Sequence, residues 1–159
     1  MNPTTVALAI GTTLSLGMGE RPGVEGHFTL RSKAIEIQAL ASDSNKYTGR
    51  GWIFRPQVDV HVGCAYAGAA YSWRNGGDWE KQVLWLRGGL EFWVWNSERS
   101  RLLIGPEIES ATHSKNQELR GAIVFKFDWK NLRIEGKTAI TSHIQGTGVS
   151  QSIYTGVLF

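Results

Sequence analysis

The sequence lacks several features that would assign its class directly. Cys64 is the only cysteine in 159 residues, which excludes an internal disulfide framework and any cysteine-rich zinc module. No apolar run approaches the roughly 18 residues that a membrane-spanning helix needs. The charge excess is small, because 17 Lys and Arg stand against 14 Asp and Glu, so the net charge of +3 gives no argument for nucleic acid.

Glycine and aromatic residues are abundant instead, with 19 glycines, 7 tryptophans, 6 phenylalanines and 4 tyrosines. A chain that is 42% hydrophobic and 19% charged is not a disordered polymer. Its length predicts one domain, residues 1–159, and no linker or low-complexity tract divides it. Residues 1–5 contain no basic group, so 6–10 is not predicted to be a secretory signal core. Either the chain is a mature form with a new Met, which we assume, or it never used that export route.

Apolar residues recur with a period of two along the whole chain, which is typical of β-strands. The apolar positions are even in 6–16, in 52–66 and in 84–94. Within 24–41 the apolar parity changes between Leu30 and Ile35, which predicts a bulge. Eight antiparallel strands are therefore expected. They are 6–16, 24–41, 52–66, 84–94, 101–112, 118–129, 132–143 and 150–159.

The loops between these strands predict their register. Lys130-Asn131 suits a two-residue hairpin, 96–100 is a short connection, and Asn75-Gly76-Gly77 suits a three-residue loop. Each loop aligns oppositely charged residues across its hairpin, which supports the assignment. The aligned pairs are Asp128 with Arg133, Lys126 with Glu135, Arg87 with Glu109, and His61 with Glu91.

Eight antiparallel strands of this length can close into an up-and-down barrel without free edges. Two architectures fit an uncharged apolar face: a soluble barrel with that face inside, or a transmembrane barrel with that face toward lipid and a polar, filled lumen. The second is favoured because the charged face also carries small residues such as Ala9, Gly63 and Gly89, which a narrow lumen requires. Short connections at one end and a long 66–82 hairpin at the other fit it too.

The transmembrane interpretation assigns two sets of residues. A belt of lipid-facing aromatics is expected at the inner rim: Trp52, Phe54, Phe127, Trp129 and Phe159. Ion pairs are expected to fill the lumen, because buried charges must be paired. This network is predicted to comprise Arg55, Asp59, His61, Arg87, Glu91, Glu107, Glu109, Lys126, Asp128, Arg133, Glu135 and Lys137.

The alternation and the final Tyr154-Thr155-Gly156-Val157-Leu158-Phe159 resemble those of small eight-stranded bacterial outer-membrane barrels. A carboxy-terminal aromatic residue after alternating apolar ones is a hallmark of that family. The resemblance implies insertion in the outer membrane of a Gram-negative cell, with membrane lipid or lipopolysaccharide as partner. It covers the whole chain in pattern.

Two candidate chemistries remain. The histidines at 27, 61, 113 and 143 lie on separate strands without metal-ligand spacing, so no metal and no cofactor is predicted. The segment around His143 resembles that of barrels that deacylate lipid A, but Gln145 stands where the serine nucleophile belongs, and Gln151 near the carboxylate. Ser142 and His143 are adjacent, so their side chains point to opposite faces of a strand. They are only weak catalytic candidates.

The predicted function is therefore a non-enzymatic outer-membrane barrel with a structural or surface-interaction role. Its outer loops are expected to meet a protein partner, and its lumen is expected to be closed by ion pairs. The first alternative is an outer-membrane hydrolase that removes lipid A acyl chains. The second is a soluble barrel with reversed faces, acting as a small-ligand carrier or a viral structural component. Nucleic acid is not expected as a partner, because no strand face combines aromatic and basic residues in a stripe.

Overall fold

The fold is an all-β antiparallel sheet, seen in a computed structural model that describes residues 5–16, 23–32, 34–42, 52–75, 82–112, 118–143 and 146–159. No helix in these ranges has the length and hydropathy needed to cross a membrane. The strands are β1 (Thr5–Leu16), β2 (Gly23–Arg31), β3 (Ile35–Ser42), β4 (Trp52–Val62), β5 (Ala65–Asn75), β6 (Gln82–Leu90), β7 (Phe92–Asn96), β8 (Ser100–Thr112), β9 (Leu119–Trp129), β10 (Leu132–His143) and β11 (Gly146–Leu158).

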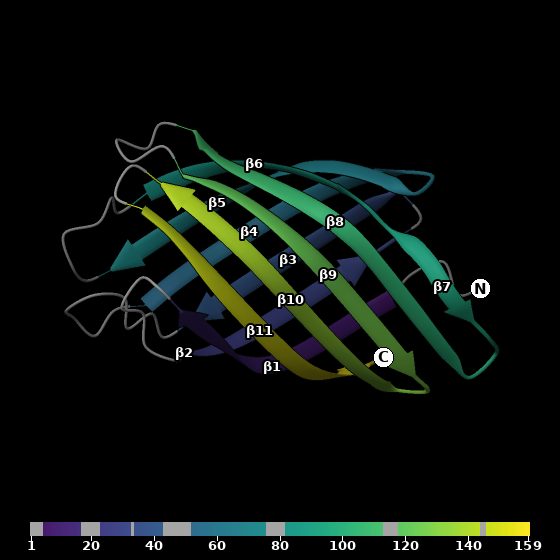
Figure 1. The fold of residues 1–159 in the computed structure, drawn as a ribbon. Helices are drawn as coiled ribbons and strands as arrows, with labels where there is room; N and C mark the ends of the chain where they lie inside the picture. Colours follow the sequence, from purple (N-terminus) through teal and green to yellow (C-terminus); the bar gives the residue numbers. More distant parts are fainter. Residues whose placement is uncertain are drawn as a thin grey trace.

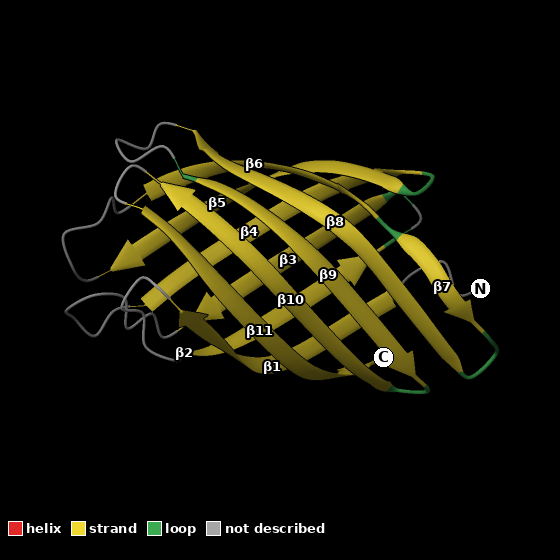
Figure 2. Ribbon diagram, viewed as in Figure 1, coloured by secondary structure: helices red, strands yellow, loops and turns green. Residues whose placement is uncertain are grey.

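The sheet closes into a barrel. Neighbouring strands follow the order β6-β5-β4-β3-β2-β1-β11-β10-β9-β8-β7, and an additional pairing of β6 with β8 joins the two ends of that order. The eleven strands occupy ten positions around the barrel, because β6 and β7 lie end to end along β8 and share one position. Figure 1 shows β8 to β11 crossing in front of β1 to β5. Figure 2 shows that the described residues outside the strands form short turns.

The two ends of the barrel differ in their connections. We call the end that holds residues 32–34, 63–64, 97–99 and 130–131 the short-turn rim. Both chain termini lie at this end in Figure 1. At the opposite end, which we call the distal rim, strands are joined through 17–22, 43–51, 76–81, 113–118 and 144–145. The tip of the predicted 66–82 hairpin thus lies outside the described residues, whereas its arms are β5 and β6.

The expected count of eight strands is wrong, because two short turns were not recognised. The segment 24–41 is two strands, β2 and β3, joined at 32–34, where Ser32 Oγ accepts a hydrogen bond from the Ile35 backbone N–H. The parity change that predicted a bulge is the parity change across this turn. The second turn is Gly63-Cys64 between β4 and β5, and Gly63 has a positive φ of 63° there, a conformation that favours glycine.

The missed turns reverse strand direction and face for part of the chain. Trp52 and Phe54 begin a strand at the distal rim, so their predicted place at the short-turn rim is wrong. Phe127, Trp129 and Phe159 do lie at the short-turn rim. Tyr66, assigned by alternation to the apolar outer face, lies inside and is buried.

Register follows the predictions where the turns were recognised. Arg133 pairs with Asp128, Glu135 with Lys126, and Arg87 with Glu109, as predicted. The predicted alignment of His61 with Glu91 is wrong, because His61 pairs with Tyr66 across the Gly63-Cys64 turn. The two side chains nevertheless approach each other inside the barrel, with 3.7 Å between His61 Nδ1 and Glu91 Oε2.

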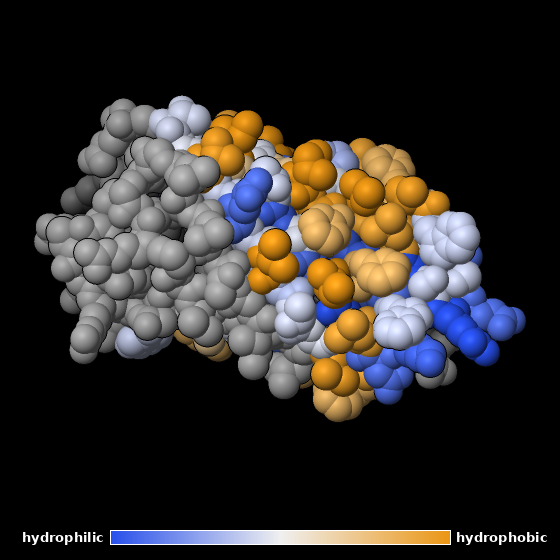
Figure 3. Space-filling model, turned by 60° about the horizontal axis from the view of Figure 1, so that its bottom comes forward, coloured by the Kyte–Doolittle hydropathy of each residue, from blue (hydrophilic) through white to orange (hydrophobic). Residues whose placement is uncertain are grey.

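The outer surface is apolar and carries no charge. Among the strand residues whose side chains are described, none at an outward position is Asp, Glu, Lys or Arg. Val58, Leu86, Ile108, Ile123 and Ile153 are each about half exposed, at 48%, 52%, 55%, 54% and 58%. Figure 3 shows hydrophobic side chains gathered over the middle of one face of the barrel and hydrophilic ones at the short-turn rim. This arrangement is the reverse of a soluble barrel with an apolar interior.

The break between β6 and β7 brings two strands unusually close together. A Cβ added at Gly105 of β8 would lie only 1.6 Å from the backbone oxygen of Leu90, at the end of β6. Only glycine fits this approach. Glu91, the residue in the break, is buried and directs its carboxylate into the barrel, where it contacts Arg31 and Lys126.

Candidate functional site: the polar interior

Charged strand residues whose side chains are described all lie at inward positions. Direct cross-strand neighbours around the barrel run from Arg31 to Glu36, Asp59, Gly68, Arg87, Glu109 and Arg120. Most neighbours in this ring are therefore opposite in charge or small. The inward set comprises Arg31, Glu36, Arg55, Asp59, His61, Arg87, Arg101, Glu107, Glu109, Arg120, Lys126, Asp128, Arg133, Glu135 and Lys137.

One cluster fills the interior near the short-turn rim. This short-turn cluster consists of Arg31, Glu36, His61, Glu91 and Lys126, which come from β2, β3, β4, the β6–β7 break and β9. Arg31 Nη2 donates to Glu91 Oε2 at 2.7 Å, and Arg31 Nη1 lies 3.3 Å from Glu36 Oε2. Lys126 Nζ lies 3.5 Å from Glu91 and 3.7 Å from Glu36. Two cations thus share two carboxylates.

Amide side chains extend this cluster toward the middle of the barrel. Gln38 donates a hydrogen bond to Glu36, and Gln57 Nε2 donates to Gln38 Oε1 at 3.1 Å and to Asp59 Oδ2 at 2.7 Å. Gln57 and Asp59 are buried. Because these amides connect carboxylates on neighbouring strands, the short-turn cluster is hydrogen-bonded to the charges above it.

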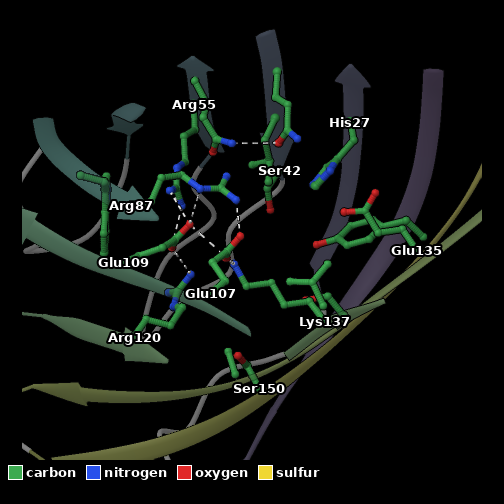
Figure 4. Close-up of a pocket in the computed structure, with 18 of the residues that line it drawn as sticks. His27, Ser42, Arg55, Arg87, Glu107, Glu109, Arg120, Glu135, Lys137 and Ser150 are labelled. Carbon is green, nitrogen blue, oxygen red and sulfur yellow. Dashed lines mark hydrogen bonds and ion pairs between the residues drawn. The ribbon is translucent and has the colours of Figure 1, made fainter. Parts of the chain in front are cut away.

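A second cluster lies at mid-barrel around Glu107 and Glu109 of β8. This central cluster also contains Arg55, Asp59, Tyr66, Arg87, Arg120 and Lys137. Glu107 accepts hydrogen bonds from Tyr66, at 2.7 Å, and from Arg87 and Lys137. Glu109 lies 2.9 Å from Arg55, 3.6 Å from Arg120 and 3.6 Å from Lys137. Figure 4 shows both carboxylates among these cations.

Aromatic rings support the cations from the side. The guanidinium groups of Arg55 and Arg120 lie 5.2 Å and 5.6 Å from the centre of the Trp85 ring, within cation–π range. Trp85 is buried, and its indole N–H donates to Ser72 Oγ at 3.1 Å. Arg87 lies in the same way over Tyr66, at 5.2 Å. The rings hold the guanidinium planes in place without adding charge.

Other residues named from the sequence lie in smaller contacts. Near the short-turn rim, Arg133 donates hydrogen bonds to both carboxylate oxygens of Asp128, at 2.7 Å and 2.9 Å. Sequence reasoning missed Arg31, Glu36, Tyr66 and Arg120. The signal for Arg120 was present, because the 130–131 turn places it on the same face as Lys126. The others depended on the two missed turns.

A cavity of about 170 Å³ occupies the distal half of the interior. Arg55, Arg87, Glu107, Glu109, Arg120 and Lys137 line one side of it, and Thr141, Ser150 and Ser152 lie among its remaining wall residues. Lys126 and Glu135 lie deepest toward the short-turn rim, where the short-turn cluster follows.

The metal and catalytic candidates named from the sequence lie in separate places. No set of three or more His, Cys, Asp and Glu side chains there is placed to hold a metal ion. Ser142 is exposed on the outer face of β10, and Gln151 is exposed on the outer face of β11. The side chain of His143, together with His113 and Gln145, lies outside the described residues, while His27 packs against Tyr154 with ring centres 4.1 Å apart.

No protein-family model matches the chain, and no curated protein matches it. Among solved structures it is similar to a loop L8 deletion mutant of OmpT, an outer membrane protein of Vibrio cholerae, with 10% sequence identity and a TM-score of 0.33. The match covers 87% of this chain and 54% of that one, so the chain spans about half the length of that protein.

Proposed function

We propose that this chain is an integral β-barrel of a Gram-negative outer membrane, non-enzymatic, with a structural or surface-interaction role. The observation that carries the proposal is the uncharged outer face of a closed barrel. A barrel surface in water tolerates charged residues. A surface in hydrocarbon does not, because a single Arg or Lys at the bilayer midplane lowers the stability of the folded barrel by about 2–4 kcal/mol. Closure through β6 and β8 pairs both edges of the strands at mid-barrel, where an open edge would face hydrocarbon, and β7 lies beyond the end of β6.

The height of the apolar surface supports the same conclusion. β4 and β9 each have 11 residues. Such strands are about 36 Å long at roughly 3.3 Å per residue, and a tilt of about 45° reduces their height to roughly 25 Å. This is the height of the apolar band in outer-membrane barrels.

Exposed aromatic residues near both ends of the barrel fit the two membrane–water boundaries. At the distal rim Phe54 stacks with Trp73, with ring centres 5.9 Å apart, and Trp52 is exposed beside them. At the short-turn rim Phe92 and Trp129 are exposed. Tyr and Trp favour the headgroup region, because their rings are apolar but carry a polar edge. Exposed aromatic residues thus lie at both rims, whereas the sequence predicted one aromatic belt at a single rim.

The interior supports a closed barrel rather than an open pore. The short-turn cluster joins β2, β3 and β9 across the interior through ion pairs, and a hydrogen bond from Arg31 to His61 adds β4. The membrane partner is then lipid or lipopolysaccharide around the outer face. Protein partners would meet the loops of the distal rim, since short turns face the periplasm and longer loops face outward in barrels of this kind.

A pair of substitutions at different depths tests the proposal. Val58 lies at the middle of β4 and Val62 at its end beside the Gly63-Cys64 turn, on the same outer face. We expect Val58→Arg to destabilise the folded barrel in lipid vesicles by about 2–4 kcal/mol, and Val62→Arg by at most about 1 kcal/mol. The measurement is urea unfolding in vesicles, with heat-modifiable gel migration as the sign of the folded barrel.

The same two variants distinguish the membrane barrel from the soluble alternative. On a water-exposed surface both arginines are tolerated equally. Equal stability of the two variants, or a wild-type chain that stays folded and monomeric without detergent or lipid, overturns the proposal.

A further inference from the structure

We propose that the distal half of the barrel interior is a binding site for a small oxyanion, of the size of phosphate or a short carboxylate. The site is the cavity between the central cluster and the hydroxyl-bearing part of its wall on β10 and β11. This goes beyond a structural role, because it gives the interior a ligand.

The carboxylates of the cavity wall are already occupied. Glu107 accepts from Tyr66, Arg87 and Lys137, and Glu109 is surrounded by four cations. The side chains of Glu107 and Glu109 are only 3% and 2% exposed. They have little free surface to offer a cation entering the cavity.

Two of the cations are more exposed than the carboxylates beside them. The side chains of Lys137 and Arg120 are 21% and 20% exposed, far more than the carboxylates they contact. An arginine has five N–H donors and a lysine three, more than two carboxylates can accept. Arg55 and Arg87 add two further guanidinium groups beside the same carboxylates. Both residues line the cavity.

The charge of the lining has the same sign. Five cationic side chains and three carboxylates border the cavity, which leaves 5 − 3 = +2. Asp59 lies behind Arg87, with 3.7 Å between its carboxylate and Arg87 Nε, and Glu118 contacts Arg120 at 3.2 Å. Glu36 and Glu91 lie behind Lys126 in the same way, at 3.7 Å and 3.5 Å. These four carboxylates offset the excess from outside the lining, but an anion in the cavity still meets donors first. The five cations are Arg55, Arg87, Arg120, Lys126 and Lys137, and the carboxylates are Glu107, Glu109 and Glu135.

The rest of the wall suits an oxyanion as well. Thr141 accepts a hydrogen bond from Arg120 Nε at 3.2 Å, so its own hydroxyl proton remains a donor. Ser150 and Gly148 line the same side and leave space. The cavity volume is about 170 Å³. Drug-sized ligands need about 300 Å³ or more, so only a small molecule fits.

The test is calorimetric titration of the full chain, folded in detergent, with inorganic phosphate and separately with acetate, at constant ionic strength set by chloride. We expect saturable binding of at least one of these anions. Lys137→Gln should weaken it by about tenfold, because a charge-assisted hydrogen bond contributes that much. Arg133→Gln is the matched control, since it also removes one interior cation but lies outside the cavity lining, paired with Asp128.

Heat-modifiable migration first establishes that each variant is folded, and Arg120→Gln replaces Lys137→Gln if the latter does not fold. Retained binding in Arg133→Gln together with weakened binding in the cavity variant supports the site. Absence of saturable binding of both anions to the wild type, or equal weakening in the cavity variant and the control, overturns it. Neither result affects the membrane proposal, because that depends on the outer face alone.

Discussion

At the scale of single residues, the interior depends on carboxylates that each serve several cations. Glu109 is the clearest case, because its side chain is 2% exposed and contacts Arg55, Arg87, Arg120 and Lys137. Removing one member of a buried ion pair costs more than the pair contributes, since the remaining charges stay buried without compensation. Glu109 should therefore be among the most sensitive positions of the barrel.

We expect Glu109→Gln to lower the free energy of unfolding by about 3–5 kcal/mol. The side chain keeps its shape but no longer neutralises the surrounding guanidinium and ammonium groups. Glu98→Gln is the control, because Glu98 is exposed in the 97–99 turn. Urea titration of the two variants in the same vesicles measures the difference, and a Glu109 variant as stable as the Glu98 variant contradicts the expectation.

Many inward residues were predictable from alternation and charge, because period two leaves only one choice of face once a strand is assigned. Asp128, Arg133 and Lys126 follow from the 130–131 turn alone. Tyr66 was not predictable in this way, since the even apolar pattern continues through the Gly63-Cys64 turn while the chain reverses. The outward positions change from even in β4 to odd in β5, but the aromatic Tyr66 occupies an even position and hides this change in the sequence.

At the scale of strands, the pairing of β6 with β8 closes the barrel, and Gly89 lies in it opposite Glu107. A Cβ at Gly89 would lie 2.5 Å from the Tyr66 hydroxyl and 2.6 Å from the Pro106 backbone oxygen. Because one obstacle is backbone, a side-chain rotation alone does not relieve the clash. Gly121 of β9 offers a comparison, since a Cβ there meets nothing within 4 Å.

Gly89→Ala should therefore destabilise the barrel by about 1–3 kcal/mol through overpacking, whereas Gly121→Ala should be neutral or stabilising by up to about 1 kcal/mol. Denaturant unfolding of both variants checks this. If the two alanines have the same effect, the close approach at the β6–β8 seam does not constrain the fold.

The strands themselves were less predictable than their faces. Turn 32–34 contains Ser32, Lys33 and Ala34, none of them glycine, proline, asparagine or aspartate. Such a turn has no compositional signal, and its parity change is indistinguishable from a bulge in the sequence alone. Missing it reversed β4, which moved Trp52 and Phe54 to the wrong rim.

At the scale of the whole molecule, the short-turn cluster spans the interior near the short-turn rim, and the cavity lies toward the distal rim. In planar bilayers bathed in about 1 M KCl, surface charges are largely screened. We expect conductance steps far below those of a porin of about 16 strands, which encloses an aqueous channel. Bilayer recordings on the same membranes compare the two proteins. Stable steps of porin size contradict a closed barrel.

The separation of charge from apolar surface also limits how the barrel enters a bilayer. A lone hairpin such as β9–β10 carries Arg120, Lys126, Arg133 and Lys137 on one face. Arg133 is paired within the hairpin, with Asp128, whereas the other three contact carboxylates on β3 and β8. Inserted alone, the hairpin would expose them to hydrocarbon. In the proposed membrane barrel, insertion is therefore coupled to ring closure, because a hairpin that inserts before β3 and β8 places Lys126 and Lys137 in hydrocarbon away from their carboxylate partners.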